Sequence, residues 1–160
     1  MKPEEITPET GLCTILGYNA QTGYIRRYFN KIMKLNTLNA TAIALNIKDE
    51  HFSITMSSVG QSKVTQMMIE KEFGEKALVY CEGVNECAKR EGRIDFIEVK
   101  DTKVYGYCLD DEAEALFENK AFLDEQILIV AKIMLIANRW FGSKIDVDDI
   151  PILIGDRKDG

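Results

Sequence analysis

The stretch that decides the fold is residues 94–110, which read IDFIEVKDTKVYGYCLD. Two strand-like runs, residues 94–100 and 103–108, flank a short polar step at residues 100–102, and this pattern predicts a β-hairpin. The acidic residues 110–118 follow at once, and acidic side chains in a first turn stabilise a helix through its macrodipole. The stretch therefore predicts a hairpin that leads into a helix.

Three elements are predicted before this hairpin in the first third of the chain. Residues 12–17 (LCTILG) form an apolar run closed by glycine, which is typical of a buried strand. Residues 23–33 carry apolar side chains at helical spacing, which predicts an amphipathic helix. Residues 39–47 (NATAIALNI) alternate in polarity, which predicts a second strand.

The region between that strand and the hairpin is predicted to hold a strand and two helical segments. Residues 52–56 (FSITM) alternate like a strand. Ser62 is a candidate cap for a helix that carries Val64, Met67 and Met68. Residues 77–81 fit either a short strand or the continuation of that helix. Residues 85–90 then read as a helical turn.

After the hairpin and its helix, the last long element is predicted over residues 122–141. Its centre, ILIVAKIMLIA, is apolar nearly all round, so we expect it to be buried on more than one face, and Gly142 is its natural C-cap. Because strands and helices alternate, the sequence predicts an α/β fold in a single domain, with a mixed sheet flanked by helices on both faces. The domain is predicted over residues 11–143, between an N-terminal tail (1–10) and a C-terminal tail (144–160).

Composition excludes several classes of protein. The net charge of −6 in 160 residues argues against a nucleic-acid-binding surface. The longest apolar run, residues 127–137, is interrupted by Lys132 and is too short to span a bilayer. No signal peptide begins the chain, so a cytoplasmic location is predicted. The four cysteines form no CxxC pair and there is one histidine, so neither a metal site nor a disulfide is expected.

In this order the elements resemble the N-terminal catalytic domain of the shikimate/quinate dehydrogenase family. That family has a first loop of the type G-N-P-x-x-x-S-x-S-P-x-x-H-N, which resembles residues 17–30 (GYNAQTGYIRRYFN). Its strand N-V-T-x-P-H-K is similar to residues 52–58 (FSITMSS). Its hairpin V-N-T-V-V-x-x-D-G-x-L-x-G-Y-N-T-D is similar to residues 94–110, and its last helix, M-L-V-x-Q-x-x-x-Q-F-x-x-W-x-G, to residues 128–142 (LIVAKIMLIANRWFG).

The chain departs from the family where the cofactor is handled. The family's Rossmann domain belongs between the acidic helix and the last helix, where residues 118–122 form a short junction. No G-x-G-x-x-G sequence occurs, so no cofactor is predicted. The two hydroxyl groups with which the family holds the substrate carboxylate fall at Gly23 and Ile25, and the family's helical glutamine falls at Lys132.

The resemblance implies candidate site residues. In the family a lysine and an aspartate assist proton transfer at the substrate hydroxyl group. Asp110 occupies the aspartate position, whereas the lysine has no equivalent in register. Lys63, in the loop after the similar strand, is the candidate partner, and the alternative is a solvated lysine. The candidate substrate-binding residues are Lys132, Asp95, Ser57, Ser58 and Tyr107.

Lys132 is the most informative of these residues. It lies in the most apolar helix, where lysine is rarely buried without a partner. We expect it to pair with Asp110, with Asp95 or with a ligand carboxylate; the alternative is that its side chain extends to the helix edge. The acidic residues after Asp110 are interpreted as a solvated helix start rather than a cation site.

The leading functional hypothesis is a shikimate-dehydrogenase-like protein without dehydrogenase activity, which binds a small carboxylated molecule or a protein partner. A second hypothesis is an enzyme that uses the same cleft for other acid–base chemistry on a small carboxylated substrate, with Asp110 and Lys132 or Lys63 as its pair. A third is the substrate subunit of a complex with a separate cofactor-binding chain. We also expect a homodimer with the last helix at or near the interface, and no nucleic-acid or membrane partner.

Overall fold

The computed structural model describes residues 6–118 and 123–153. The chain divides into two compact units. The sheet unit consists of Leu12–Gly23 and Ala42–Leu109, and the helical unit of Met1–Gly11, Tyr24–Thr41 and Asp110–Gly160. Among the residues described, no helix is long and apolar enough to cross a membrane.

The sheet has six strands in the order β2-β1-β3-β5-β6-β4. Pairing is parallel between β1 and β3 and between β4 and β6, and antiparallel between β3 and β5 and between β5 and β6. The predicted α/β class with a mixed sheet is therefore confirmed. The strands are β1 (Gly11–Gly17), β2 (Ala40–Asn46), β3 (Gln66–Ile69), β4 (Gly83–Val84), β5 (Phe96–Lys100) and β6 (Lys103–Tyr107).

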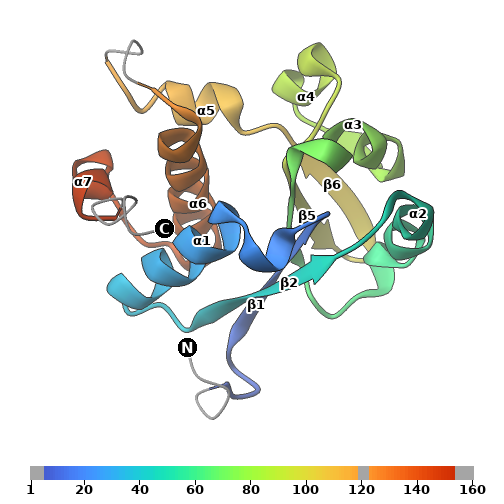
Figure 1. Ribbon diagram of the computed structural model, residues 1–160, viewed down its shortest axis with the longest axis horizontal. Coiled ribbons are helices and arrows are strands. Elements are labelled where there is room, and N and C mark those ends of the chain that lie inside the picture. Colours follow the sequence, from blue (N-terminus) through green and yellow to red (C-terminus); the bar gives the residue numbers. More distant parts are fainter. Residues whose placement is uncertain (1–5, 119–122, 154–160) are drawn as a thin grey trace. The chain divides into compact units, whose positions relative to one another are not determined.

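The core of the sheet unit lies between one face of the sheet and three helices, α2 (Asp49–Ser57), α3 (Gly74–Ala77) and α4 (Glu86–Glu91) (Figure 1). Because successive side chains of a strand point to opposite faces, alternate strand residues such as Ile97 and Val99 share this face. They form one buried cluster with Leu16, Phe52, Met56, Met67, Ile69, Phe73, Ala88 and Val104. Short 3₁₀ turns complete the unit: η2 (Ala20–Thr22), η3 (Val59–Gln61), η4 (Lys71–Phe73) and η5 (Leu78–Tyr80).

The predicted hairpin is confirmed as β5 and β6, which pair up to Lys100 opposite Lys103. The two turn residues, Asp101 and Thr102, both have positive φ, at 52° and 66°. Such a turn matches the twist of the flanking strands, but it is a conformation that favours Asn and Gly. Asp101 is tolerated at the first of these positions, whereas the β-branched Thr102 is an unfavourable residue type at the second.

Two predictions between β2 and the hairpin are wrong. Residues 52–56 belong to helix α2, where Phe52 and Met56 are buried and Ile54 is 73% exposed, so the apolar spacing is i, i+4 rather than alternate. The segment predicted as a helix after Ser62 contains strand β3, in which all four residues are buried. Residues 77–80 are helical, at the end of α3 and in η5.

The helical unit is built around α6 (Glu125–Phe141), against which α1 (Tyr24–Leu35), α5 (Asp110–Glu114) and α7 (Ile150–Leu153) pack. Tyr28 Oη donates a hydrogen bond to Gln126 Oε1 at 2.7 Å, which ties α1 to α6. Gly142 ends α6 in the left-handed conformation, as predicted. The predicted start of this helix, Phe122, lies outside the residues described.

Six residues of α6 are already buried in the single chain, without a second copy: Val130, Ala131, Ile133, Met134, Ile136 and Ala137. The turn η7 (Val147–Asp149) and α7 follow in the segment predicted as a C-terminal tail, of which residues 154–160 are not described. The domain boundaries at residues 11 and 143 stay predictions.

Candidate functional site

The helical unit contains an ion pair between Asp110, the first residue of α5, and Lys132, in the middle of α6. Lys132 Nζ lies 2.6 Å from Asp110 Oδ1, and the two side chains are only 14% and 18% exposed. This arrangement satisfies the rule that a lysine in an apolar helix needs a partner when it is buried. Of the partners predicted for Lys132, the structure shows Asp110.

The pairing limits what either residue can do with a ligand. A ligand carboxylate that approaches Lys132 has to share the ammonium group with Asp110, which is feasible because that group has three donor hydrogens. The roles predicted for the two residues in catalysis and substrate binding stay predictions.

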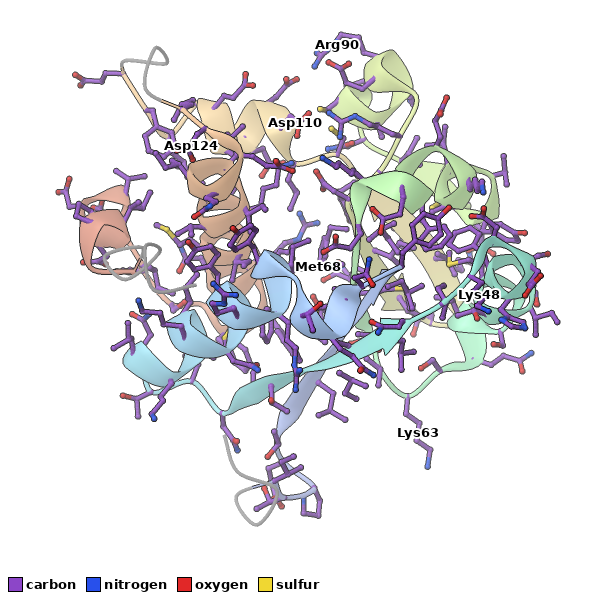
Figure 2. The ribbon with its side chains drawn as sticks, viewed as in Figure 1. Lys48, Lys63, Met68, Arg90, Asp110 and Asp124 are labelled. Carbon is purple, nitrogen blue, oxygen red and sulfur yellow. The ribbon has the colours of Figure 1, made fainter. Side chains whose placement is uncertain are left out.

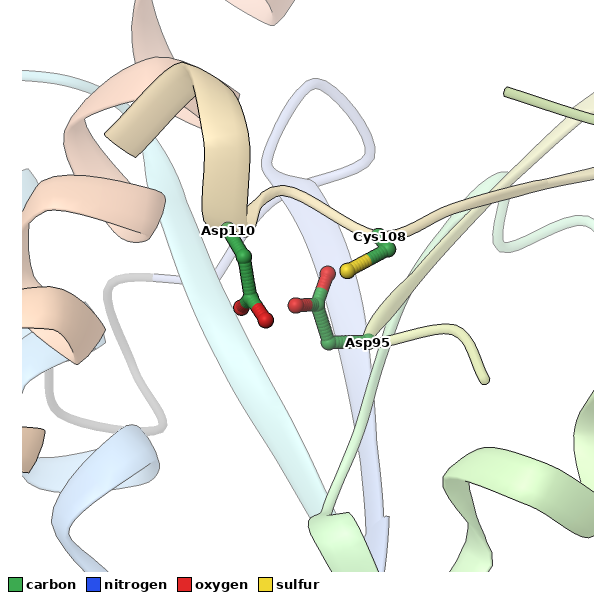
Figure 3. Close-up of side chains that lie close together, drawn as sticks. All are labelled: Asp95, Cys108 and Asp110. Carbon is green, nitrogen blue, oxygen red and sulfur yellow. The ribbon is translucent and has the colours of Figure 1, made fainter. Parts of the chain in front are cut away.

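In the sheet unit, the segment that leaves β6 is held by side chains from two other segments. Asp95, just before β5, accepts a hydrogen bond from the amide of Leu109 at 3.1 Å (Oδ1) and 3.3 Å (Oδ2). Figure 3 shows the Asp95 carboxylate beside Cys108, whose Sγ lies within 4.8 Å of it. Asn85 holds the backbone of Cys108 from another side. These bonds hold the backbone of Cys108 and Leu109 against Asn85 and Asp95.

Tyr107, another predicted substrate-binding residue, is the last residue of β6 and is half-buried. Its ring packs against Phe96 of the neighbouring strand at a centroid distance of 5.8 Å. Its backbone carbonyl accepts a hydrogen bond from the amide of Asp95 at 2.8 Å. Asp95 and Tyr107 thus lie at the same end of the sheet.

Ser57 and Ser58 lie elsewhere in the sheet unit, at the end of helix α2 and exposed. Ser57 Oγ donates to the carbonyl of Ile54 and Ser58 Oγ to that of Thr55, so both hydroxyl groups bond within their own helix. The comparison of residues 52–58 with a family strand is therefore wrong, because this segment is helical.

Lys63 is exposed in the loop before β3, and Figure 2 shows its side chain extending away from the ribbon. It precedes β3, whereas Asp95 precedes β5, and these two strands are antiparallel with Met68 opposite Phe96. Lys63 and Asp95 therefore lie at opposite ends of the sheet. This position gives no support to Lys63 as a partner in acid–base chemistry.

Lys71 is the lysine that the sequence alone did not single out. It follows β3 after Glu70, and β3 is the strand that pairs in parallel with β1. The family pattern named above has a lysine just after a strand, and β3 with Lys71 fits that pattern better than residues 52–58 do. The short apolar run of residues 67–69 (MMI), followed by charged residues, is the signal that could have found it.

A hydrogen-bonded cluster lies near the end of β1. Tyr18 Oη donates to Asp49 Oδ1, and Lys76 Nζ lies 2.8 Å from the same oxygen. The hydrogen bond from Lys76 and then that from Tyr18 lower the pKa of Asp49, and Asp49 raises the pKa of both partners. Tyr18 N also donates to Glu72 Oε2 at 2.9 Å. The cluster holds the loop after β1, but its groups are exposed, so solvent screens the charges.

Cys13 and Cys81 lack the features of a catalytic nucleophile. Burial raises the pKa of Cys13 to about 12 and that of Cys81 to about 11. A reactive cysteine needs a lowered pKa and an accessible sulfur. All four cysteines are free thiols.

The sequence matches no protein-family profile and no curated protein. The structure is similar to the shikimate dehydrogenase of Aquifex aeolicus, with a TM-score of 0.64 and 17% identity over 80% of this chain and 54% of that one. The shikimate 5-dehydrogenase of Listeria monocytogenes, solved with shikimate and NAD, matches with a TM-score of 0.62 and 13% identity over 69% of this chain and 38% of that one. The 5-ketofructose reductase of Gluconobacter sp. strain CHM43 has a TM-score of 0.63 and 11% identity, covering 81% and 51%.

This chain thus spans about half or less of the length of these solved proteins. At such identities the likeness establishes the fold. The predicted resemblance to shikimate dehydrogenases is confirmed at that level.

Proposed function

We propose that this chain is a shikimate-dehydrogenase-like binding protein without dehydrogenase activity, which holds a small carboxylated molecule. The observation that carries the proposal is the ion pair of Asp110 with Lys132, at 2.6 Å in a largely buried setting. In the family that the chain resembles, the aspartate acts on the substrate hydroxyl group together with a lysine. Here Asp110 is engaged by a lysine at the position of the family's helical glutamine.

The ion pair makes proton transfer through Asp110 costly. When Asp110 accepts a proton from a bound hydroxyl group, it becomes neutral and loses its charge interaction with Lys132. Breaking a buried pair of this kind costs roughly 3–5 kcal/mol, which is a large addition to a chemical barrier. A site of this kind is better suited to holding a ligand than to dehydrogenating it.

The connection between α5 and α6 also supports a role without a nicotinamide cofactor. Helix α5 ends at Glu114 and α6 begins at Glu125, so this segment has no room for the nucleotide-binding domain of the family. The Listeria monocytogenes structure, by comparison, was solved with shikimate and NAD. The cytoplasmic location is part of the proposal, and the four free thiols suit a reducing compartment.

The ligand is proposed to carry a carboxylate because Lys132 offers a cation for it. A charge-assisted hydrogen bond to a cation contributes roughly 1.5–3 kcal/mol, which is enough to hold a small acid modestly. A neutral polyol lacks the group that would bind most strongly to Lys132.

A thermal-shift screen of the purified chain against small ring acids, including shikimate and quinate, and against NADP tests this proposal. A ligand at a hundred times its dissociation constant adds about 2.7 kcal/mol to the free energy of unfolding. We expect a shift with a ring acid that is lost in Lys132→Met and kept in Lys144→Met, a control lysine that is exposed in the same unit. Turnover of shikimate with NADP by the isolated chain would contradict the proposal. No shift with any acid would favour a protein partner instead.

A second candidate function is acid–base catalysis on a small carboxylated substrate, and the position of Lys71 directly after β3 favours it. Lys71 would then supply the lysine of the family's pair. In this case Lys71→Met lowers kcat at least about a hundredfold on the substrate found, the size typical of losing a general acid or base. Unchanged kcat in Lys71→Met and Asp110→Asn would exclude it. Copurification with a nucleotide-binding chain would instead support a substrate subunit.

A further inference from the structure

In the helical unit, all charged residues of helix α1 are basic, and all charged residues of the segment 110–118 are acidic. Helix α1 holds four basic residues and no acidic one, with the sequence YIRRYFNKIMKL. Residues 110–118 (DDEAEALFE) hold five acidic residues and no basic one. In the whole chain 26 acidic residues outnumber 20 basic ones, so α1 is a local exception in sign.

Side chains of the outer face of α1 combine charge with exposed apolar surface. Tyr24, Arg27, Lys31 and Lys34 follow one another at spacings of three, four and three residues, which places them along one face of the helix. Arg27 and Lys34 are exposed and Lys31 is half-buried. Tyr24, at one end of the helix, is 41% exposed, and Leu35, at the other end, is 53% exposed.

Several basic residues of α1 lie at positions where a positive charge destabilises the helix. Arg26 and Arg27 lie in the first turn, where the macrodipole disfavours cations, and this turn contains no acidic residue. Arg27 and Lys31 are like charges four residues apart, which destabilises a helix further. Residues that break local rules in this way often serve a function. An anionic surface placed against this face would remove both penalties.

The guanidinium group of Arg27 is also positioned in advance. Its Cζ lies 5.2 Å from the centroid of the Tyr24 ring, which in turn stacks on Tyr28 at 6.2 Å. Tyrosine and arginine are the residue types that dominate the energetics of protein interfaces, and a fixed side chain loses little entropy on binding. The outer face of α1 thus has the composition of a protein-binding surface.

We propose that a second copy of this chain docks on α1 and pairs the exposed acidic residues of its segment 110–118 with the basic face. Glu112 and Glu118 are exposed acidic residues of that segment. In a two-fold dimer each copy supplies both surfaces, so the contact forms twice. The net charge of −6 disfavours nucleic acid as the occupant, and the exposed Tyr24 and Leu35 suit a protein surface.

This interface differs from the one expected from sequence, which was placed at α6. The most buried residues of α6 are covered within one chain, so α6 does not need a partner to cover them. The proposal also stands independently of any ligand bound near Lys132, since it uses exposed residues of α1 and of residues 110–118.

Sedimentation velocity at low and high salt tests the proposal with the full chain. We expect a dimer at low salt whose dissociation constant rises at high salt, because exposed charges are screened. The double variant Arg27→Glu/Lys34→Glu should weaken the dimer at least about tenfold, equivalent to about 1.4 kcal/mol. Glu112→Lys/Glu118→Lys should weaken it similarly, and an equimolar mixture of the two variants should form a heterodimer. The matched control is Lys48→Glu/Lys63→Glu, which changes the net charge equally on exposed residues of the sheet unit.

Three results would overturn the proposal. The first is a protein that stays monomeric at all salt concentrations. Binding of nucleic acid to α1 in such a monomer would show that the basic face has a different partner. The second is a dimer that the charge-reversal variants leave intact. The third is a failure of the two weakened variants to associate with each other, which would show that α1 and residues 110–118 do not meet. Circular dichroism of each variant confirms that it is folded.

Discussion

The side chain of Asn85 holds the backbone of Cys108 on both sides. Its Oδ1 accepts a hydrogen bond from Cys108 N at 3.1 Å, and its Nδ2 donates one to Cys108 O at 2.9 Å. The same Oδ1 accepts from Ala88 N at 3.0 Å and so caps helix α4. One amide group therefore joins α4 to the segment that leaves β6.

We expect Asn85→Ala to lower the free energy of unfolding by about 2–3 kcal/mol, since it removes a helix cap and leaves the Cys108 amide and carbonyl without their partner. Asn85→Asp keeps both accepted hydrogen bonds but places a carboxylate oxygen against the carbonyl oxygen of Cys108, so it should lose more stability at neutral pH than at an acidic pH, where the carboxyl group is protonated and can donate. Urea denaturation at both pH values measures the two variants. Equal losses of Asn85→Asp at the two pH values would show that the bond to the Cys108 carbonyl contributes little.

The ion pair of Lys132 and Asp110 gives a second prediction. Lys132→Met leaves the Asp110 carboxylate largely buried without its cation, which should cost about 3 kcal/mol of stability. The double variant Asp110→Asn/Lys132→Met removes both charges and should recover a large part of that loss. Chemical denaturation of the single and double variants gives the coupling energy. Additive losses would mean that the two residues do not stabilise each other.

The turn between β5 and β6 predicts a stabilising substitution. Thr102 is β-branched and has a φ of 66°, a conformation that costs such a residue about 1–2 kcal/mol. Thr102→Gly relieves this strain, and the greater freedom of glycine in the unfolded chain offsets part of the gain, so we expect about 1 kcal/mol of added stability. Lys103→Gly, one residue later in β6, should destabilise the protein instead. Thermal unfolding distinguishes the two.

The buried thiol of Cys13 predicts how stability depends on alkaline pH. Burial raises its pKa from 9.0 to about 12, so the folded state retains a proton that the unfolded state loses. The contribution is fully present below pH 9 and is lost as the pH rises toward 12. We expect the free energy of unfolding of the wild type to fall more steeply above pH 9 than that of Cys13→Ala. Parallel pH profiles of the two proteins would show that the pKa of Cys13 is the same in the folded and the unfolded state.

Elements with one dominant pattern could be predicted from the sequence. The predicted hairpin is present as β5 and β6, and the run of apolar residues at helical spacing in residues 23–33 became α1. These patterns are repeated over many positions, so only one of the two periods, that of a strand or that of a helix, fits each segment. The ion pair of Lys132 was among the predicted alternatives. A lysine in an apolar helix either pairs with an acidic group or extends to the helix edge, so few environments had to be considered.

Short apolar runs could not be predicted in the same way. In residues 52–56 the positions of Phe52 and Met56 fit a strand and a helix equally well, and only the exposed fraction of Ile54 decides between them. Asp49 and Glu50, acidic residues in the first turn of α2, were the local signal for a helix. The error moved the comparison with the family strand away from β3 and so missed Lys71.

The order of the strands has a consequence for how the chain folds. Strands β5 and β6 pair across a two-residue turn, whereas Cys13 of β1 pairs with Gln66 of β3 only after the whole intervening chain is brought together. Closing such a long loop costs entropy before any hydrogen bond compensates for it, so contacts of this kind form late. In pulse-labelled hydrogen exchange we expect the hairpin amides to be protected first. The parallel pairing of β1 with β3 would then be the slow step in reaching the native state.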